Sequence, residues 1–390
     1  MVRWMIYGRF LMLFFCISIG FVIISCGPKA VKPVSEMDTP MHHFNAGVKF
    51  LDQGKYADAN MSFDRSLALD PKFSKAYAGN SLASAYQGEL KAANDSMKQA
   101  WSYAKNDDEK LFVHISRIRL YTLSMADKDW LKDAKAEFDK AKKIDPRSSA
   151  AYYFMGIAYK NALDFPNAGQ MFKQVIDFKG DYIKEADAEW NLTQKIQRAM
   201  PGTITGKKIA ILERINRGDA AALFMEELKI DALYKKKTLR TFDTTFKDPE
   251  AARAAANAAP VTAKDIANHP LKTDIEGVLR IGVRGLEAYP DGSFHPGDMV
   301  DRATYAMMIE DVLIKVTGDN ALATKFIGSA SPFPDLRNDL PYFNSVMVVT
   351  SRGIMEAKDF STGEFAPLSP VPGVDALLII RKLKEELKIF

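Results

Sequence analysis

Cysteine is scarce in this chain of 390 residues. The two cysteines, Cys16 and Cys26, both lie within the first 26 positions, so the long remainder of the chain cannot form a disulfide. Its stability must therefore come from packed cores. The length is sufficient for two or three such cores, each in its own domain.

An excess of one charge is also absent. The chain carries 53 basic and 49 acidic residues, for a formal net charge of +4. Its one run of basic residues is the short stretch 235–237. Nucleic-acid-binding proteins concentrate positive charge on one face, so this composition argues against a nucleic-acid partner.

The residue patterns of the common enzyme classes are missing too. The sequence has no H-E-x-x-H zinc motif and no G-x-S-x-G nucleophile motif. The stretch "GTITGKK" (202–208) has too few residues between its glycines for a phosphate loop and no Ser or Thr after its lysines. The histidines are scattered, at positions 42, 43, 114, 269 and 295. We therefore expect no catalysis, no cofactor and no metal site.

The N-terminus has the pattern of a targeting signal. Arg3 and Arg9 precede an apolar stretch from Phe10 to Ser25 that has signal-peptide length. The residues "IISCG" (23–27) resemble a bacterial lipobox, which implies a signal peptide over 1–25 and lipidation of Cys26. Gly27 after the cysteine implies transfer to the outer membrane, and 26–39 would be the lipidated tether. The alternative is an uncleaved membrane anchor with an incidental cysteine.

The next part of the chain repeats itself. "MHHFNAGVKFLDQGKYADANMSFDRSLALDPK" (41–72) resembles a tetratricopeptide repeat, with Gly47 at a close helix crossing and Phe63 filling the space between the helices. Three further copies follow with a period of about 34 residues, the third displaced by an insert. The resemblance implies an α-helical solenoid over 40–182.

Solenoids of this type bind partners in an inner groove formed by the first helix of each pair. The register places six side chains there, and they would suit a peptide or the C-terminus of an unknown protein partner. An ordinary surface is the alternative. The predicted groove residues are Phe44, Val48, Tyr86, Arg119, Tyr153 and Lys160.

The C-terminal half contains a different motif. "EGVLRIGVRGLEAYPDGSFHPGDMVDRATYAMMIEDVL" (276–313) resembles an S-layer homology motif, in which a glycine-rich loop leads to an arginine at the start of a helix. Weaker copies occur before it, with Arg217 at the arginine position, and after it, with Gly373 there. The resemblance implies a three-motif helical domain over 183–390, with an alanine-rich insertion near 241–262.

In that family the loop and arginine hold an acidic cell-wall glycan. The resemblance therefore implies glycan contacts from Arg302 and Arg217, with Arg284 as a secondary candidate, and no anion site at Gly373. The structural alternative is that each arginine pairs with a local acid such as Asp301 or Asp298. An anion at a helix N-terminus would also be favoured by the helix dipole.

Together these patterns predict an all-α lipoprotein of the outer membrane that faces the periplasm. It would bind peptidoglycan or an associated acidic glycan at one end and a protein partner in the solenoid. The alternative function is that of an assembly factor for a pilus or an outer-membrane protein complex, with the C-terminal half only positioning it.

Overall fold

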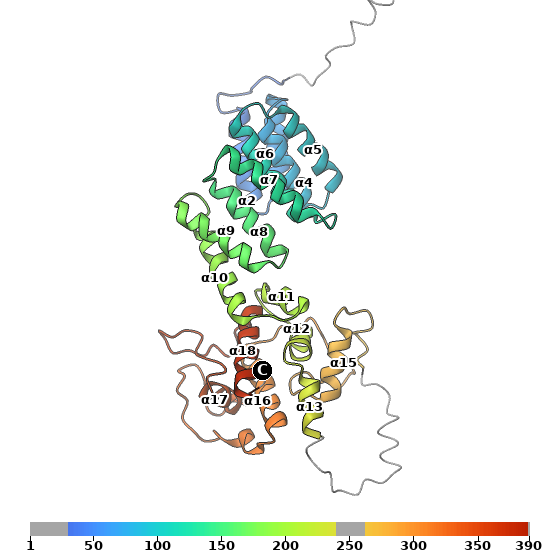
Figure 1. Cartoon of the computed structure of the whole chain (residues 1–390), viewed down its shortest axis with the longest axis vertical. Coiled ribbons are helices and arrows are strands. Elements are labelled where there is room, and N and C mark those ends of the chain that lie inside the picture. The colour runs from blue at the N-terminus through green and yellow to red at the C-terminus, as the bar shows by residue number, and fades with distance from the viewer. Residues whose placement is uncertain (1–29, 239–261, 389–390) are drawn as a thin grey trace, which may run out of the picture. The chain divides into compact units, whose positions relative to one another are not determined.

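A computed structural model describes residues 30–238 and 262–388 (Figure 1). The described residues are helical and contain no β-strand, only two isolated bridges that pair Asn216 with Met299 and Asp301 with Pro370. The predicted all-α class is therefore confirmed. The predicted signal peptide, Cys26 and almost all of the alanine-rich insertion lie outside the described residues.

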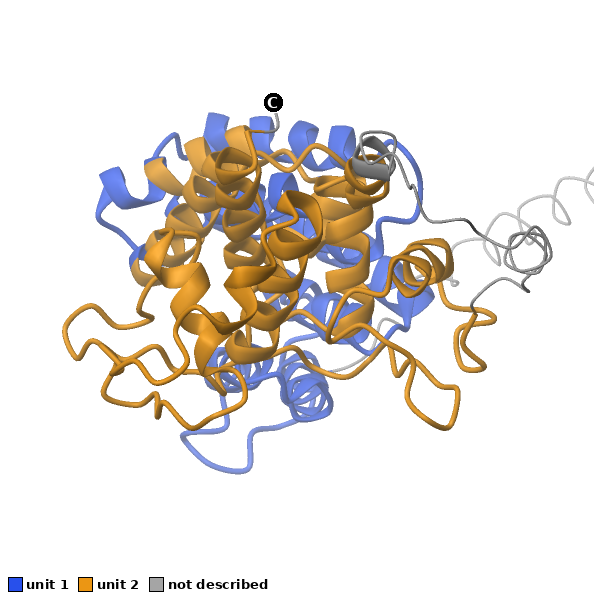
Figure 2. Cartoon of the chain, turned by 90° about the horizontal axis from the view of Figure 1, so that it is seen from below, with its two compact units in different colours: residues 1–162, 174–183 blue, residues 163–173, 184–390 orange. Residues whose placement is uncertain are grey.

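The chain divides into two compact units (Figure 2). Unit 1 contains residues 1–162 and 174–183, and unit 2 contains residues 163–173 and 184–390. The helix α9 (Phe165–Phe178) thus contributes residues to both units.

Unit 1 is a stack of helical hairpins. Consecutive helices pack against each other in pairs, and the first helices of successive pairs, α2, α4, α6 and α8, also contact one another. The bounds of its helices are α2 Pro40–Asp52, α3 Tyr56–Leu69, α4 Ser74–Tyr86, α5 Leu90–Tyr103, α6 Asp107–Ser124, α7 Trp130–Ile144 and α8 Ser149–Asn161.

Small residues bring these helices close together. Phe63 is fully buried between α2 and α4, beneath Gly47 and Gly79. A Cβ atom at either glycine would lie within 2.6 Å of the Phe63 ring. The predicted helix crossing at Gly47 is therefore confirmed, and glycine is the residue that the close packing allows.

Unit 2 contains three helix–loop–helix segments, which we call the first (184–227), second (272–317) and third (343–386) segments. Each begins with one helix and ends with another. The short helix α11 lies in the loop of the first segment, α13 follows the first segment, and η2 follows the second. The bounds are α10 Ile183–Ala199, α11 Ile204–Ala210, α12 Arg217–Ala222 with its π-helical continuation η1 Leu223–Glu227, α13 Ile230–Thr238, α15 Lys272–Ile281, α16 Arg302–Thr317, η2 Asn320–Thr324, α17 Phe343–Ser351 and α18 Gly373–Glu386.

Backbone hydrogen bonds join the three segments in a ring. The Ile215 amide donates to the Val371 carbonyl at 2.9 Å, Val371 donates to Val300 at 3.2 Å, and Val300 donates back to Ile215 at 3.1 Å. Each of these residues stands two positions before the residue that begins the segment's last helix. The three segments therefore take equivalent places around one centre.

The centre of unit 2 is tightly packed. Tyr305 of α16 is fully buried, and its hydroxyl donates to the Ala376 carbonyl of α18 at 3.2 Å. Its ring stacks on Phe224 of η1, with the ring centroids 5.9 Å apart. One side chain thus contacts the last helix of both other segments and joins the three helices at the centre of the unit.

Candidate functional site

Two arginines stand at the first residue of a capped helix. The Asn216 side chain accepts from the Asp219 amide before α12, and the Asp301 carboxylate accepts from the Thr304 amide at 2.7 Å before α16. Such caps satisfy amides that have no partner inside the helix. The predicted helix starts at Arg217 and Arg302 are confirmed.

Arg217 is enclosed by the loop of the second segment. Its Nε donates to the Phe294 carbonyl at 2.9 Å, Nη1 donates to Gly285, and Nη2 donates to Glu287 at 2.8 Å. The guanidinium also lies 4.6 Å from the Phe294 ring centroid and 5.0 Å from that of Tyr289. These contacts join the first and second segments. A glycan contact from Arg217 stays a prediction.

Arg302 holds the loop of the third segment in the same manner, but with fewer bonds. Its Nε donates to the Phe365 carbonyl at 2.8 Å, Nη2 donates to Glu356 at 2.6 Å, and the Phe365 ring lies 4.5 Å away. Phe365 and Glu356 occupy the same loop positions as Phe294 and Gly285 around Arg217. The two arginine sites can therefore be compared position by position.

The comparison shows that the Arg302 site is open where the Arg217 site is closed. The loop positions of Glu287 and Tyr289 are held by Lys358 and Phe360 in the third segment. Within residues 30–238 and 262–388, neither a third carbonyl nor a second ring contacts the Arg302 guanidinium. Phe360 is 78% exposed, against 41% for Tyr289.

A cavity of about 530 Å³ lies at this opening. Five cationic side chains line it, against two acidic ones, an excess of three positive charges. The cavity draws on α10, the start of α16, the loop of the third segment and α18. Its charged lining residues are Lys195, Arg198, Arg302, Lys358, Lys382, Glu356 and Asp375.

Local acids neutralise only part of this charge. Lys195 lies 3.7 Å from Asp375, and Lys382 lies 2.5 Å from Glu356. The two remaining surface cations, Arg198 and Lys358, form no ion pair with any residue of the described ranges. Both are exposed, so their charges are available to a ligand in the cavity.

Arg302 itself is 8% exposed. Burial lowers the pKa of its guanidinium, while the carboxylates of Asp375 and Asp335 act in the opposite direction. Because an arginine guanidinium loses its proton only in strong base, the group remains a cation near neutral pH. A partly desolvated cation at the base of a cavity interacts more strongly with an anion than one on an open surface.

The third predicted arginine, Arg284, is paired. Its Nη1 lies 3.0 Å from the carboxylate of Glu310, which is buried and also accepts from the Asn344 side chain and the Ser345 hydroxyl. Burial raises the pKa of Glu310, and these hydrogen bonds oppose the increase. Arg284 lines a cavity of about 220 Å³. Its charge is offset there, and a glycan contact from it stays a prediction.

Position 373 explains why the third segment carries no arginine. The Gly373 amide donates to the Leu212 carbonyl at 2.9 Å, and a Cβ at this position would lie 1.8 Å from the Ile209 carbonyl oxygen. No side chain fits without displacing the backbone of α11. The arginine position is therefore filled by backbone contact between the third and first segments.

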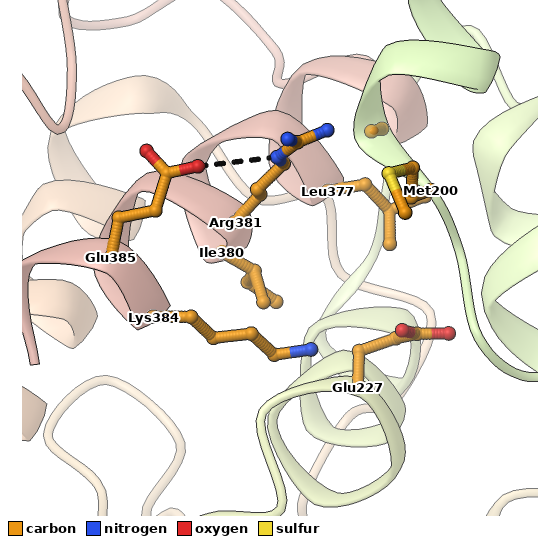
Figure 3. A pocket seen from close by; sticks show the side chains of 8 residues that line it. Met200, Glu227, Leu377, Ile380, Arg381, Lys384 and Glu385 are labelled. Carbon is orange, nitrogen blue, oxygen red and sulfur yellow. Dashed lines mark hydrogen bonds and ion pairs between the residues drawn. The ribbon is translucent and has the colours of Figure 1, made fainter. Parts of the chain in front are cut away.

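A third cavity in unit 2, of about 230 Å³, differs in charge from the cavity at Arg302 (Figure 3). Arg381 points toward Glu385, and the amino group of Lys384 lies on the side of Glu227 (Figure 3). The Glu227 carboxylate is already used, because it accepts from the amides of residues 202 and 203. With two cations and two acids this cavity has no net charge, so it favours an anion less than the cavity at Arg302.

In unit 1, two predicted groove residues lie inward. Phe44 is a core residue, 6% exposed, that packs against the rings of Phe63, Phe73 and Phe112. Val48 is partly buried against the same core. Their helix α2 turns its apolar face toward α3 and α4, which corrects the prediction of an open position for Phe44.

Other predicted groove residues form two aromatic groups. Tyr86 stacks on Tyr56 with centroids 4.6 Å apart. Arg119 lies 4.4 Å from the Phe154 ring, and Tyr153 beside it stacks on Tyr182 at 4.8 Å. Lys160 is partly buried further along α8. The structure thus brings Arg119 and Tyr153 into one cluster and places Tyr86 in a separate pair.

Sequence reasoning found Arg302 but missed the cations around it. Lys195 and Arg198 lie on α10, Lys358 lies in a loop and Lys382 lies on α18, so no spacing in the sequence connects them. The one signal in the sequence for a difference between the two arginine sites was the alignment of Phe360 with Tyr289.

No described helix is long and apolar enough to cross a membrane. A scan against protein-family models gave no match, and a search of curated proteins gave no similar sequence.

Proposed function

We propose that this chain is a non-catalytic cell-envelope lipoprotein that binds peptidoglycan or a wall-linked anionic glycan. The cavity beside Arg302 would be the binding site, within a domain of the S-layer homology type. The observation that carries the proposal is the excess of positive charge around this cavity, in contrast to the closed site at Arg217.

Anionic polymers suit this site for physical reasons. A hydrogen bond between a cation and a carboxylate contributes about 1.5 to 3 kcal/mol. Arg198 and Lys358 have no described acidic partner, so a ligand carboxylate would meet cations that are not already neutralised. Surface charges are screened by salt, so binding should weaken as the ionic strength increases.

The proposed anchor is a lipid on Cys26 in the outer membrane, with unit 2 facing the periplasm. Its support is the sequence "IISCG" before a polar tether. More than one acyl chain gives durable membrane attachment. A lipid at one end and a wall-binding site at the other would tether the membrane to the wall.

Unit 1 would then bind a protein partner, as tetratricopeptide repeats do. The support is the stack of hairpins and the exposed or half-buried aromatic groups at Tyr86 and at Arg119 with Tyr153. Loss of a specific complex in a Tyr86→Ala or Tyr153→Ala variant would support this role.

The experiment that tests the proposal is co-sedimentation of the full chain, in detergent, with purified sacculi. The test variant is Arg198→Ala with Lys358→Ala, because both side chains are exposed and their removal leaves no described acid unpaired. The matched control is Lys208→Ala with Arg280→Ala, which removes one lysine from α11 and one arginine from α15, both exposed and without an ion pair among the described residues.

We expect the test variant to bind sacculi at least tenfold more weakly, and the control to bind as the unaltered chain does. A tenfold weakening corresponds to a loss of about 1.4 kcal/mol of binding free energy. Failure of the unaltered chain to sediment with sacculi, or equal effects of the two double variants, would contradict the proposal.

A further inference from the structure

Phe360 is an exposed aromatic side chain at the rim of the cationic cavity. With 78% of its surface exposed, it is among the most exposed large apolar residues that the structure describes. Its counterpart Tyr289 packs over Arg217 instead. The apolar ring of Phe360 is thus exposed to water at the rim of a cavity that five cationic side chains line.

The turn that carries Phe360 is held by hydrogen bonds within the loop. The Asp359 carboxylate accepts from the Ser361 amide at 2.7 Å and from the Ser361 hydroxyl at 2.6 Å. The Gly363 amide donates to the Asp359 carbonyl, and the Lys358 amide donates to the Glu364 carbonyl. These bonds hold the backbone on both sides of the ring, so Phe360 is presented by a fixed turn.

We infer that Phe360 stacks on the pyranose ring of an acidic sugar whose carboxylate is held by the cations of the cavity. This inference rests on the proposed function and specifies its ligand class. One face of a pyranose ring presents C–H groups, which are apolar and slightly positive, and the face of an aromatic ring is negative. An inorganic polyphosphate offers no such face and a peptide carboxylate carries no pyranose ring, so neither provides this stacking contact with Phe360.

The test measures binding of tetragalacturonate, which carries one carboxylate on each pyranose ring, to the full chain by isothermal titration calorimetry. The variants are Phe360→Ala and Phe360→Trp, with Leu368→Ala as the control. Leu368 is a similarly exposed apolar residue of the same loop, 74% exposed, that does not line the cavity. Tripolyphosphate serves as an anion without a sugar ring.

We expect Phe360→Ala to weaken tetragalacturonate binding about tenfold, in line with the loss of the apolar contact between one face of the ring and the sugar. Phe360→Trp and Leu368→Ala should bind it as the unaltered chain does. Tripolyphosphate binding should be the same in all of these proteins.

Three results would overturn the inference: no binding of tetragalacturonate by the unaltered chain, unchanged binding by Phe360→Ala, or an equal loss of tripolyphosphate binding in that variant. None of them would remove the effect of the Arg198 and Lys358 substitutions on sacculi. Failure of the sugar inference is therefore distinct from failure of the wall-binding proposal.

Discussion

Replacing Gly373 by alanine should disrupt the contact between the third and first segments. The added Cβ would lie 1.8 Å from the Ile209 carbonyl oxygen and 2.7 Å from its carbonyl carbon. Ordinary contacts begin at 3.4 Å, so the Cβ atom and the Ile209 oxygen would have to move apart by 1.6 Å. Both atoms belong to the backbone, so rotation of a side chain cannot relieve the clash.

The cost follows from three effects. Overpacking of this kind destabilises by about 3 kcal/mol. Loss of the hydrogen bond from the Gly373 amide to the Leu212 carbonyl adds about 1 kcal/mol. The unfolded chain has less backbone freedom with alanine than with glycine, which returns about 1 kcal/mol. We therefore expect unit 2 to lose about 3 kcal/mol of unfolding free energy, which lowers its Tm by about 6 to 12 °C.

The assay is thermal unfolding of the full chain followed by circular dichroism. Two glycines of unit 2 serve as controls. A Cβ at Gly297 would meet no atom within 4 Å, and a Cβ at Gly277 would meet the flexible end of Met225. Gly297→Ala and Gly277→Ala should change the Tm by no more than about 2 °C. A Gly373→Ala protein with the same Tm as these controls would refute the reasoning.

Three further predictions concern stability. Gly79→Ala would place a Cβ 2.4 Å from the Phe63 ring and should cost unit 1 about 2 kcal/mol in urea unfolding; Phe63→Leu in the same chain should recover part of that loss. Arg217→Ala removes three hydrogen bonds to backbone carbonyls and should destabilise unit 2 by about 3 kcal/mol, measured in the same way. Burial raises the pKa of Glu137, but hydrogen bonds, including one with His114, outweigh this effect and hold the pKa below its ordinary value of 4.5. The stability that this gives is complete above about pH 4.5 and is lost as the pH falls through the lower folded-state pKa, so the unit 1 Tm should fall in acid, and less in Glu137→Gln.

The helical class and the two arginine-bearing helix starts could be predicted because local signals encode them. Asp301 before Arg302 is a helix N-cap, and small residues such as Gly47 at regular intervals indicate helix crossings. These features depend on neighbours in the chain or on one helix pair, so the sequence displays them directly.

The difference between the Arg217 and Arg302 sites could not be predicted in that way. In each site, a loop of one segment meets the guanidinium of an arginine from another segment. Residues 287–289 close over Arg217 with a carbonyl and a ring, whereas residues 358–360 leave Arg302 open. The cations Lys195 and Lys382 reach the cavity from helices far apart in the chain. Phe44 was misplaced for a related reason, because helix register alone does not separate an inward face from a groove.

The central claim is that a wall polymer binds at the open Arg302 site, and hydrogen exchange on the full chain tests it most directly. Solubilised wall fragments should slow amide exchange in residues 354–360, all but one of which line the cavity, and leave residues 283–289 unchanged, since this loop already encloses Arg217. The two loops are matched positions within one protein, so each measurement contains its own control. Unchanged exchange in 354–360, or equal slowing of both loops, would contradict the account.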